Sequence, residues 1–131
     1  MASIFTKIIN GEIPAYKIAE DENFFAFLDV FPITKGHTLV VPKKEIDYMF
    51  DLEDDLLGGL NIFSKKVAKA IEKAVTCKRI GTAVVGLEVP HAHLHLIPIN
   101  EITDISFEKP KLKFTEEEFK KIAEDIKSFL K

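Results

Sequence analysis

Three histidines at alternate positions are the residues of this sequence best suited to chemistry. His91, His93 and His95 lie within the segment Pro90–Ile97. Because side chains alternate across a β-strand, the three imidazoles are predicted to point to one face, while the apolar residues between them point to the core. With a rise of about 3.3 Å per residue, neighbouring rings originate roughly 6.6 Å apart, which suits the holding of a phosphate group.

Imidazole is suited to phosphoryl chemistry because its ordinary pKa lies near neutrality. One ring can then be neutral and nucleophilic while a protonated neighbour stabilises negative charge. A neutral histidine that attacks phosphorus forms a phosphoramidate intermediate, which divides one difficult displacement into two easier ones. The remaining rings and nearby backbone N–H groups can stabilise the charge on the phosphoryl oxygens, and no metal is required.

Two other functions fit the same residues. Alternating histidines on a strand can supply two or three ligands to a catalytic zinc ion, so a zinc-dependent hydrolase is one alternative. A nonenzymatic protein that binds a nucleotide without reacting with it is the other.

Composition excludes several broad classes. The chain has 131 residues and a formal net charge of -3, which argues against nonspecific binding to nucleic acid or an anionic membrane. No apolar run resembles a signal peptide or a membrane span, and the single Cys77 offers no disulfide framework. We therefore predict one cytoplasmic domain over residues 1–131.

Hydrophobic patterning predicts an α+β domain, with an antiparallel sheet of about five strands, one long central helix and a C-terminal helix. The expected strands are Tyr16–Glu20, Phe24–Leu28, His37–Val41, Ile80–Val85 and Ala92–Ile97, with Pro98 ending the last.

Two helices complete the predicted domain. Apolar residues recur every three or four positions from about Leu52 to Val75, with Asp51 as the expected N-cap. Near the C-terminus, Thr115 and Glu118 have the spacing of a capping box ahead of an apolar stripe.

The sequence as a whole resembles the histidine triad (HIT) family, whose signature His-x-His-x-His plus two apolar residues is matched by His91 to Ile97. The segment from Ile4 to Pro14 is similar to the family's opening segment. The segment Phe27–Pro32, followed by Gly36-His37, is similar to its nucleoside-binding stretch.

This resemblance implies a role for each matched residue. His93 would attack the α-phosphorus of a nucleotide, His95 would contact the phosphate oxygens, and His91 would orient the site through a hydrogen bond with His37. Asp29 would accept hydrogen bonds from the ribose hydroxyls. Apolar side chains would line the base pocket; these are Phe5, Ile8, Leu28 and Val30.

The resemblance also implies a purine nucleotide substrate and a homodimer. The expected reaction is hydrolysis or nucleotidyl transfer at an α-phosphate, in a nucleoside phosphoramidate or a dinucleoside polyphosphate. No cofactor is expected, although a polyphosphate substrate can bring Mg²⁺ with it.

The sequence departs from the family at two places. Many relatives have Cys-x-x-Cys and a histidine as parts of a zinc site where this chain has Ser3, Thr6 and Glu45, which argues against structural zinc. Relatives commonly have Gly-Gln before the triad, often followed by Ser or Thr, where this chain has Gly86-Leu87 followed by Glu88. Leu87 cannot form a hydrogen bond, and we hypothesise that Glu88 contacts the leaving group instead.

Overall fold

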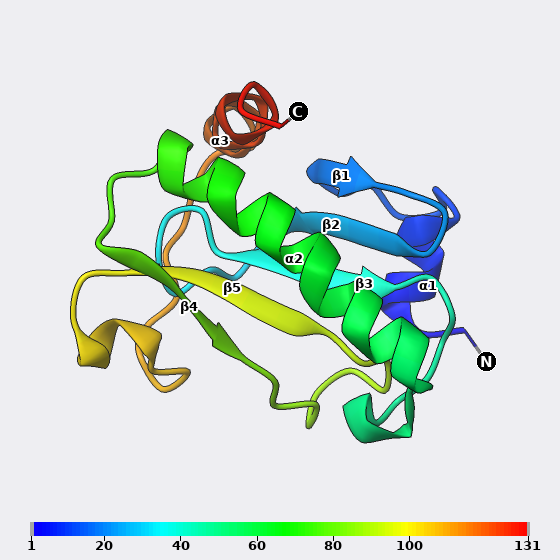
Figure 1. Ribbon diagram of the computed structural model, residues 1–131. Helices are drawn as coiled ribbons and strands as arrows, with labels where there is room; N and C mark the ends of the chain where they lie inside the picture. The colour runs from blue at the N-terminus through cyan, green and yellow to red at the C-terminus, as the bar shows by residue number, and fades with distance from the viewer. Residues whose placement is uncertain (1, 131) are drawn as a thin grey trace.

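The computed structural model describes residues 2–130, so the two terminal residues of the predicted domain lie outside it. The elements in chain order are α1 (Ile4–Ile9), β1 (Lys17–Glu20), β2 (Phe24–Leu28), β3 (Thr38–Pro42), the 3₁₀ helix η1 (Met49–Asp51), α2 (Asp54–Ala74), β4 (Arg79–Ala83), β5 (Leu94–Ile99), the 3₁₀ helix η2 (Ile102–Ile105) and α3 (Glu116–Lys127). The strands form one antiparallel sheet in the order β1-β2-β3-β5-β4 (Figure 1). The predicted α+β class is confirmed.

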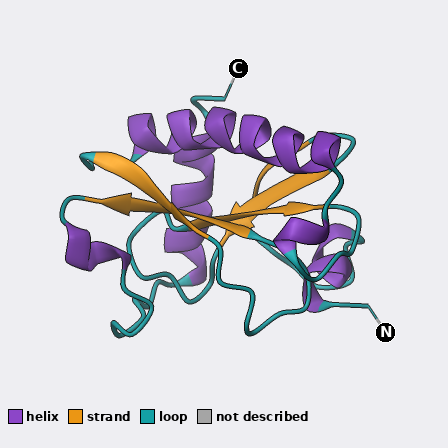
Figure 2. Ribbon diagram, turned by 60° about the horizontal axis from the view of Figure 1, so that its bottom comes forward, coloured by secondary structure: helices purple, strands orange, loops and turns teal. Residues whose placement is uncertain are grey.

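The two faces of this sheet have different coverings. Helix α2 lies across one face, and together with α3 it encloses the main hydrophobic core. The other face carries a smaller apolar cluster around Phe5 and Phe27, with α1 and several long loops beside it (Figure 2). No helix among residues 2–130 is long and apolar enough to span a bilayer.

The predicted C-terminal helix forms as expected. The Thr115 side chain accepts a hydrogen bond from the Glu118 N–H, and the Glu118 carboxylate accepts one from the Thr115 N–H. The rings of Phe114 and Phe119 are 5.4 Å apart across the first turn, as in a hydrophobic staple.

The start of the long helix differs from the prediction. Asp51 ends η1 instead of capping α2, which begins at Asp54. Leu52 lies between the two helices with extended backbone and is buried in the main core. The apolar pattern includes Leu52 because this side chain is buried in the core, although its backbone is not helical. The sequence therefore placed the start of α2 about two residues too early.

The short helix α1 was not predicted. Its six residues are too few to show a hydrophobic period, and its N-cap is the hydroxyl of Ser3, which accepts from the Thr6 N–H. This helix brings Phe5 to the histidine side of the sheet.

Strand β5 begins and ends two residues later than predicted, and it includes Pro98. Pairing with β3 ends at the pair of Thr38 and Leu96, so beyond that point β5 pairs only with β4. Proline is tolerated there because no ladder hydrogen bond to β3 is needed.

Candidate active site

Only one triad histidine belongs to a strand, but all three side chains keep the predicted alternation. His95 lies in β5 opposite Leu39, which in turn is opposite Phe27, so these three side chains share the face that α1 adjoins. Ala92, Leu94 and Leu96 lie in the main core beneath the helices. The irregular segment before β5 thus continues the alternation without ladder hydrogen bonds.

His93 is held by its own neighbour in the chain. Its Nδ1 lies 2.7 Å from the carbonyl oxygen of His91, which can only accept, so Nδ1 carries the proton. The Nε2 atom of a neutral ring then keeps its lone pair. The edge of Phe5 packs against the ring, with centroids 4.9 Å apart, and fixes its orientation.

His95 is positioned by a chain of hydrogen bonds that begins at a backbone amide. The N–H of Ile33 donates to Nδ1 of His37 at 3.1 Å, so His37 carries its proton on Nε2. That nitrogen lies 2.9 Å from Nδ1 of His95 and donates to it. His95 is therefore protonated on Nε2, which leaves an N–H donor beside the His93 ring, whose centroid lies 5.0 Å away.

The expected hydrogen bond between His91 and His37 is wrong. Both nitrogens of His91 have other partners, since Nδ1 lies 2.8 Å from the Ser3 hydroxyl and Nε2 lies 2.8 Å from the Pro42 carbonyl oxygen. His37 pairs with His95 because β3 and β5 are neighbours, whereas His91 precedes the paired segment.

The histidines around His93 are neutral at pH 7. Burial lowers the pKa of His37 from 6.5 to about 4 and that of His95 to about 3. Burial also lowers the pKa of His91. The expectation of a protonated neighbour is therefore corrected, because His95 offers a neutral N–H donor instead of a cation.

A cavity of about 250 Å³ brings the functional residues together. Its lining includes His37, His93, His95 and Asp29, whereas His91 lies behind it and is fully buried. The remaining lining residues are Phe31, Val85, Gly86, Leu87, Glu88, Phe107 and Lys111. Glu88 thus lines the same cavity as the histidines, while its contact with a leaving group stays a prediction. Leu87 lies at the rim with 88% of its surface exposed.

Phe107 and Lys111 were not predicted. They come from the segment after η2, which has no periodic pattern. The Phe107 ring lies 4.8 Å from that of His95, and the Lys111 ammonium donates to the Phe107 carbonyl oxygen. No pattern in this part of the sequence predicts that Lys111 lies at the cavity.

Asp29 lies at the end of the cavity next to His37. Its Oδ1 accepts the N–H of Phe31 at 2.8 Å, and its Oδ2 lies 3.5 Å from His37 Nε2. The carboxylate is thus fixed by the turn after β2 and keeps lone pairs available for hydroxyl donors.

The predicted base-pocket residues are dispersed by the structure. Phe5 is buried against His93, and half-buried Ile8 packs against the same cluster. Val30 is half exposed on a neighbouring groove. Leu28 lies in the main core on the opposite face of the sheet, so its predicted place in the pocket is wrong. Phe27, one position earlier, faces Phe5 at 5.5 Å, and strand alternation could have identified it.

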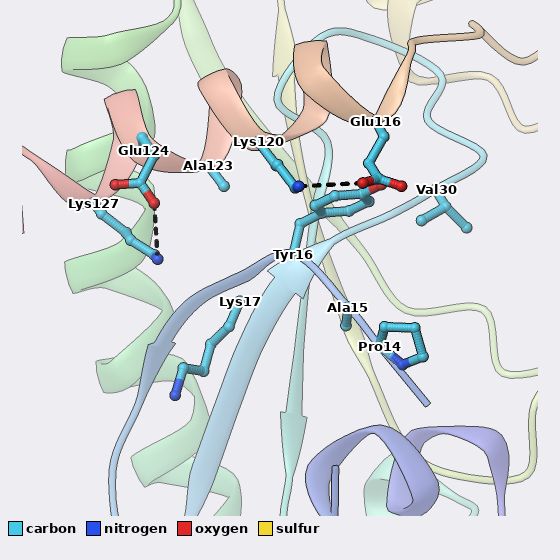
Figure 3. A pocket seen from close by; sticks show the side chains of 10 residues that line it. All are labelled: Pro14, Ala15, Tyr16, Lys17, Val30, Glu116, Lys120, Ala123, Glu124 and Lys127. Carbon is cyan, nitrogen blue, oxygen red and sulfur yellow. Dashed lines mark hydrogen bonds and ion pairs between the residues drawn. The ribbon is translucent and has the colours of Figure 1, made fainter. Parts of the chain in front are cut away.

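The groove that Val30 borders is a different feature from the histidine cavity. It lies between β1 and α3, and Figure 3 shows an apolar floor around Tyr16 flanked by charged side chains. Four of these charged side chains form two ion pairs along α3, Lys120 with Glu116 and Lys127 with Glu124. None of its lining residues is a histidine, cysteine or serine.

In the part of the chain that the structure describes, one group of residues has the composition of a metal site. Possible ligand atoms of Asp29, His37 and His95 all lie within 4.8 Å of one another. However, the nitrogens of His37 and His95 are 2.9 Å apart, which fits a shared proton better than two metal–nitrogen bonds of about 2.0–2.1 Å in tetrahedral directions.

Comparison with known proteins agrees with this geometry. A protein-family model described as the HIT domain matches residues 10–102, which include all four histidines. An adenosine 5'-monophosphoramidase of Schizosaccharomyces pombe is 37% identical over 134 residues, covering 100% of both chains.

Two further relatives extend the comparison. A HIT-like protein of Methanocaldococcus jannaschii is 46% identical over 105 residues, which cover 72% of this chain and 77% of that protein. The crystal structure of a HIT-like protein from Bartonella henselae superposes with a TM-score of 0.83 at 30% identity, covering 96% of this chain and 95% of that one.

Proposed function

The chain belongs to the HIT family, and from this premise we propose that it cleaves the bond between the α-phosphate of a purine nucleotide and its leaving group, through a nucleotidyl intermediate on His93. One observation carries this proposal. The His91 carbonyl holds the proton of His93 on Nδ1, so the Nε2 lone pair is available in the cavity that His95 and Asp29 also line.

The first step forms a bond from His93 Nε2 to the α-phosphorus and breaks the bond from phosphorus to the leaving amine or phosphate. The leaving group takes the electron pair of the broken bond and, when it is an amine, a proton. We assign Glu88 at the rim to that transfer, as a relay that takes the proton from solvent water and passes it to the amine. The His95 N–H donates to a phosphoryl oxygen while negative charge develops there.

The second step releases the product. A water oxygen attacks phosphorus, the bond to His93 Nε2 breaks, and the water proton leaves to solvent, which gives a nucleoside monophosphate. Asp29, which lines the same cavity, holds the ribose hydroxyls. We propose adenosine 5'-phosphoramidates as the substrate class, because the relative that matches over both whole chains is named as a monophosphoramidase.

The test is direct trapping of the intermediate. The protein is mixed with an adenosine 5'-phosphoramidate, quenched within one turnover and weighed by mass spectrometry. We expect an adenylyl adduct on the peptide that contains His93, and no adduct in His93→Ala. Turnover without an adduct on this peptide, or turnover that survives in His93→Ala, contradicts the proposal.

A nonenzymatic nucleotide-binding protein is the second candidate, and exposed Leu87 is the observation that favours it. This apolar side chain lies at the cavity rim, where the family has an amide. Under this alternative, calorimetry detects adenosine monophosphate binding while neither adduct nor turnover is observed.

We also propose a homodimer that forms along β4. Within residues 2–130 this strand pairs only with β5. Next to it lies a cavity of about 540 Å³ that reaches His93 and is lined by exposed Tyr48, Phe50, Val84 and Val85. An unpaired edge next to apolar surface is a template for a second chain.

Light scattering tests this assembly. We expect a dimer in the wild type and a monomer in Val84→Lys. The matched change Ile62→Lys, at an exposed apolar residue of α2 that lines a groove near β1 and α3, leaves the dimer intact. A monomeric wild type would contradict the proposal.

The cytoplasmic location, the independence of a cofactor and any Mg²⁺ carried by a polyphosphate substrate stay predictions from the sequence.

A further inference from the structure

A second hydrogen-bonded network lies behind His91, away from the cavity. The hydroxyl of Ser3 lies 2.8 Å from His91 Nδ1 and also accepts the Thr6 N–H. One oxygen of the Glu45 carboxylate accepts both the Ser3 N–H at 2.8 Å and the Thr6 hydroxyl at 2.5 Å. Residues from the start of α1, from the loop after β3 and from the triad segment thus meet at one point.

These are the positions at which many members of the family have zinc ligands, but the donor set here does not fit zinc. Ser3 and Thr6 offer neutral hydroxyls, whereas structural zinc is bound by thiolates, imidazoles and carboxylates. Both nitrogens of His91 already have partners, the Ser3 hydroxyl and the Pro42 carbonyl. The hydroxyls of Ser3 and Thr6 are themselves 3.4 Å apart, within hydrogen-bond distance.

We propose that this network takes the place of the metal as the link that fixes His91, and that Glu45 is a positioning residue for the nucleophile. The inference rests on the proposed role of His93. The path runs from Glu45 to Ser3, from the Ser3 hydroxyl to the His91 ring, and from the His91 carbonyl oxygen to the Nδ1–H of His93.

The Glu45 carboxylate helps to decide which group donates in each hydrogen bond of this path. An ionised carboxylate only accepts, so the Thr6 hydroxyl donates to Glu45. The Ser3 hydroxyl accepts from the Thr6 N–H, which leaves its own proton for His91 Nδ1. His91 Nε2–H then donates to the carbonyl oxygen of Pro42, the last residue of β3, which lies three residues before Glu45. The two hydrogen bonds at Glu45 lower the pKa of its carboxyl, so it is ionised at neutral pH.

The end of β3 and the loop after it therefore hold the triad segment at three points. Pro42 accepts from the His91 ring, Glu45 holds the helix start that contacts that ring, and the Ile46 carbonyl accepts the Ala92 N–H at 2.7 Å. Loss of Glu45 removes one of these points and leaves the residues that touch substrate unchanged.

Kinetics on Glu45 variants test the positioning role. We expect Glu45→Ala to lower kcat about tenfold with KM within about twofold, since small misplacement of a reacting group is costly. Glu45→Gln keeps an accepting oxygen and should recover most of that loss. The matched control is Glu22→Ala, which removes an exposed carboxylate in the turn between β1 and β2. An unchanged kcat in folded Glu45→Ala overturns the proposal.

A spectroscopic readout without substrate separates this proposal from the proposed function. In ¹⁵N NMR of the imidazoles, we expect His91 and His93 to show single tautomers in the wild type. In Ser3→Ala and Glu45→Ala we expect exchange-averaged shifts at both rings, and in Glu22→Ala none. Shifts of His93 that stay at the wild-type values in both variants overturn the path, whether or not the protein turns over a phosphoramidate.

Zinc titration tests the replacement of the metal. We expect the triple change Ser3→Cys, Thr6→Cys and Glu45→His to bind one Zn²⁺ per chain through the new side chains and His91. The wild type should bind none through His91, as followed by the same ¹⁵N signals. A wild type that takes up Zn²⁺ at His91, or a folded triple variant that binds none, contradicts the proposal.

Discussion

The helix-covered face and the histidine face of the sheet are made by alternate residues of the same strands and of the segments that lead into them, yet different forces order the two faces. On the helix side, residues such as Leu28, Val40 and Leu96 are buried by α2 and α3, and burial has no preferred direction. On the other side, His37, His91 and His95 are just as buried, but hydrogen bonds of fixed direction hold their rings. His37 bonds His95, and His91 bonds the Pro42 carbonyl oxygen.

This difference separates stability from reactivity within one sheet. Apolar packing tolerates small adjustments of a side chain, whereas a hydrogen bond to a backbone group decides which imidazole nitrogen carries the proton. Changes on the helix face should therefore alter the free energy of unfolding, and changes on the histidine face should alter rate and pH response.

Apart from loss of the nucleophile His93 itself, the largest expected effect is that of His95→Ala. It removes the N–H donor next to the phosphate, and loss of one such donor lowers kcat about 10²–10³-fold. Turnover of an adenosine 5'-phosphoramidate measures this, and urea unfolding reports stability in parallel. A kcat within about threefold of the wild type would show that His95 does not contact the transition state.

Leu28→Ala should give the opposite result. Truncation of a side chain buried in the core costs about 2–5 kcal/mol of unfolding free energy through lost burial and the cavity left behind. We expect kcat and KM of the folded variant to match the wild type. A raised KM for the nucleotide would show that Leu28 contacts the base, which its position in the main core contradicts.

Acid should lower the free energy of unfolding, and the buried histidines His37 and His95 should be one source of this loss. The pKa values of His37 and His95 are lower in the folded protein than the ordinary 6.5, so below pH 6.5 the unfolded chain binds protons that the folded chain does not. Their contribution to stability is therefore complete above pH 6.5 and is lost as the pH falls toward about 4 and then about 3.

Urea unfolding between pH 7 and pH 4 measures this loss. His37→Asn should show a shallower dependence on pH than the wild type. Leu28→Ala should keep the full dependence, because leucine does not titrate. Equal slopes in the wild type and His37→Asn would show that His37 is not the source.

The smallest expected effect is that of Phe107→Ala. Its ring packs edge-on against His95, but the side chain is 37% exposed, so we expect a loss of only about 0.5 kcal/mol and a less than threefold change in kcat. Ile102→Ala, in the same segment and 88% exposed, serves as the control for stability. A tenfold change in kcat would instead mark Phe107 as a substrate contact.

Local patterns by themselves determined much of this protein. Alternation in the triad segment predicted the common face of His91, His93 and His95, and the capping box predicted the start of α3. These features depend on residues a few positions apart, so the sequence contains all the information that they need.

Only the tertiary structure decided which groups the histidines bond. His37 meets His95 across 58 positions, and Ser3 meets His91 across 88, because strand order and the docking of α1 bring them together. The arrival of Lys111 at the cavity has the same origin. Pairing at such distances depends on how the strands and loops pack, which no local spacing of residues encodes.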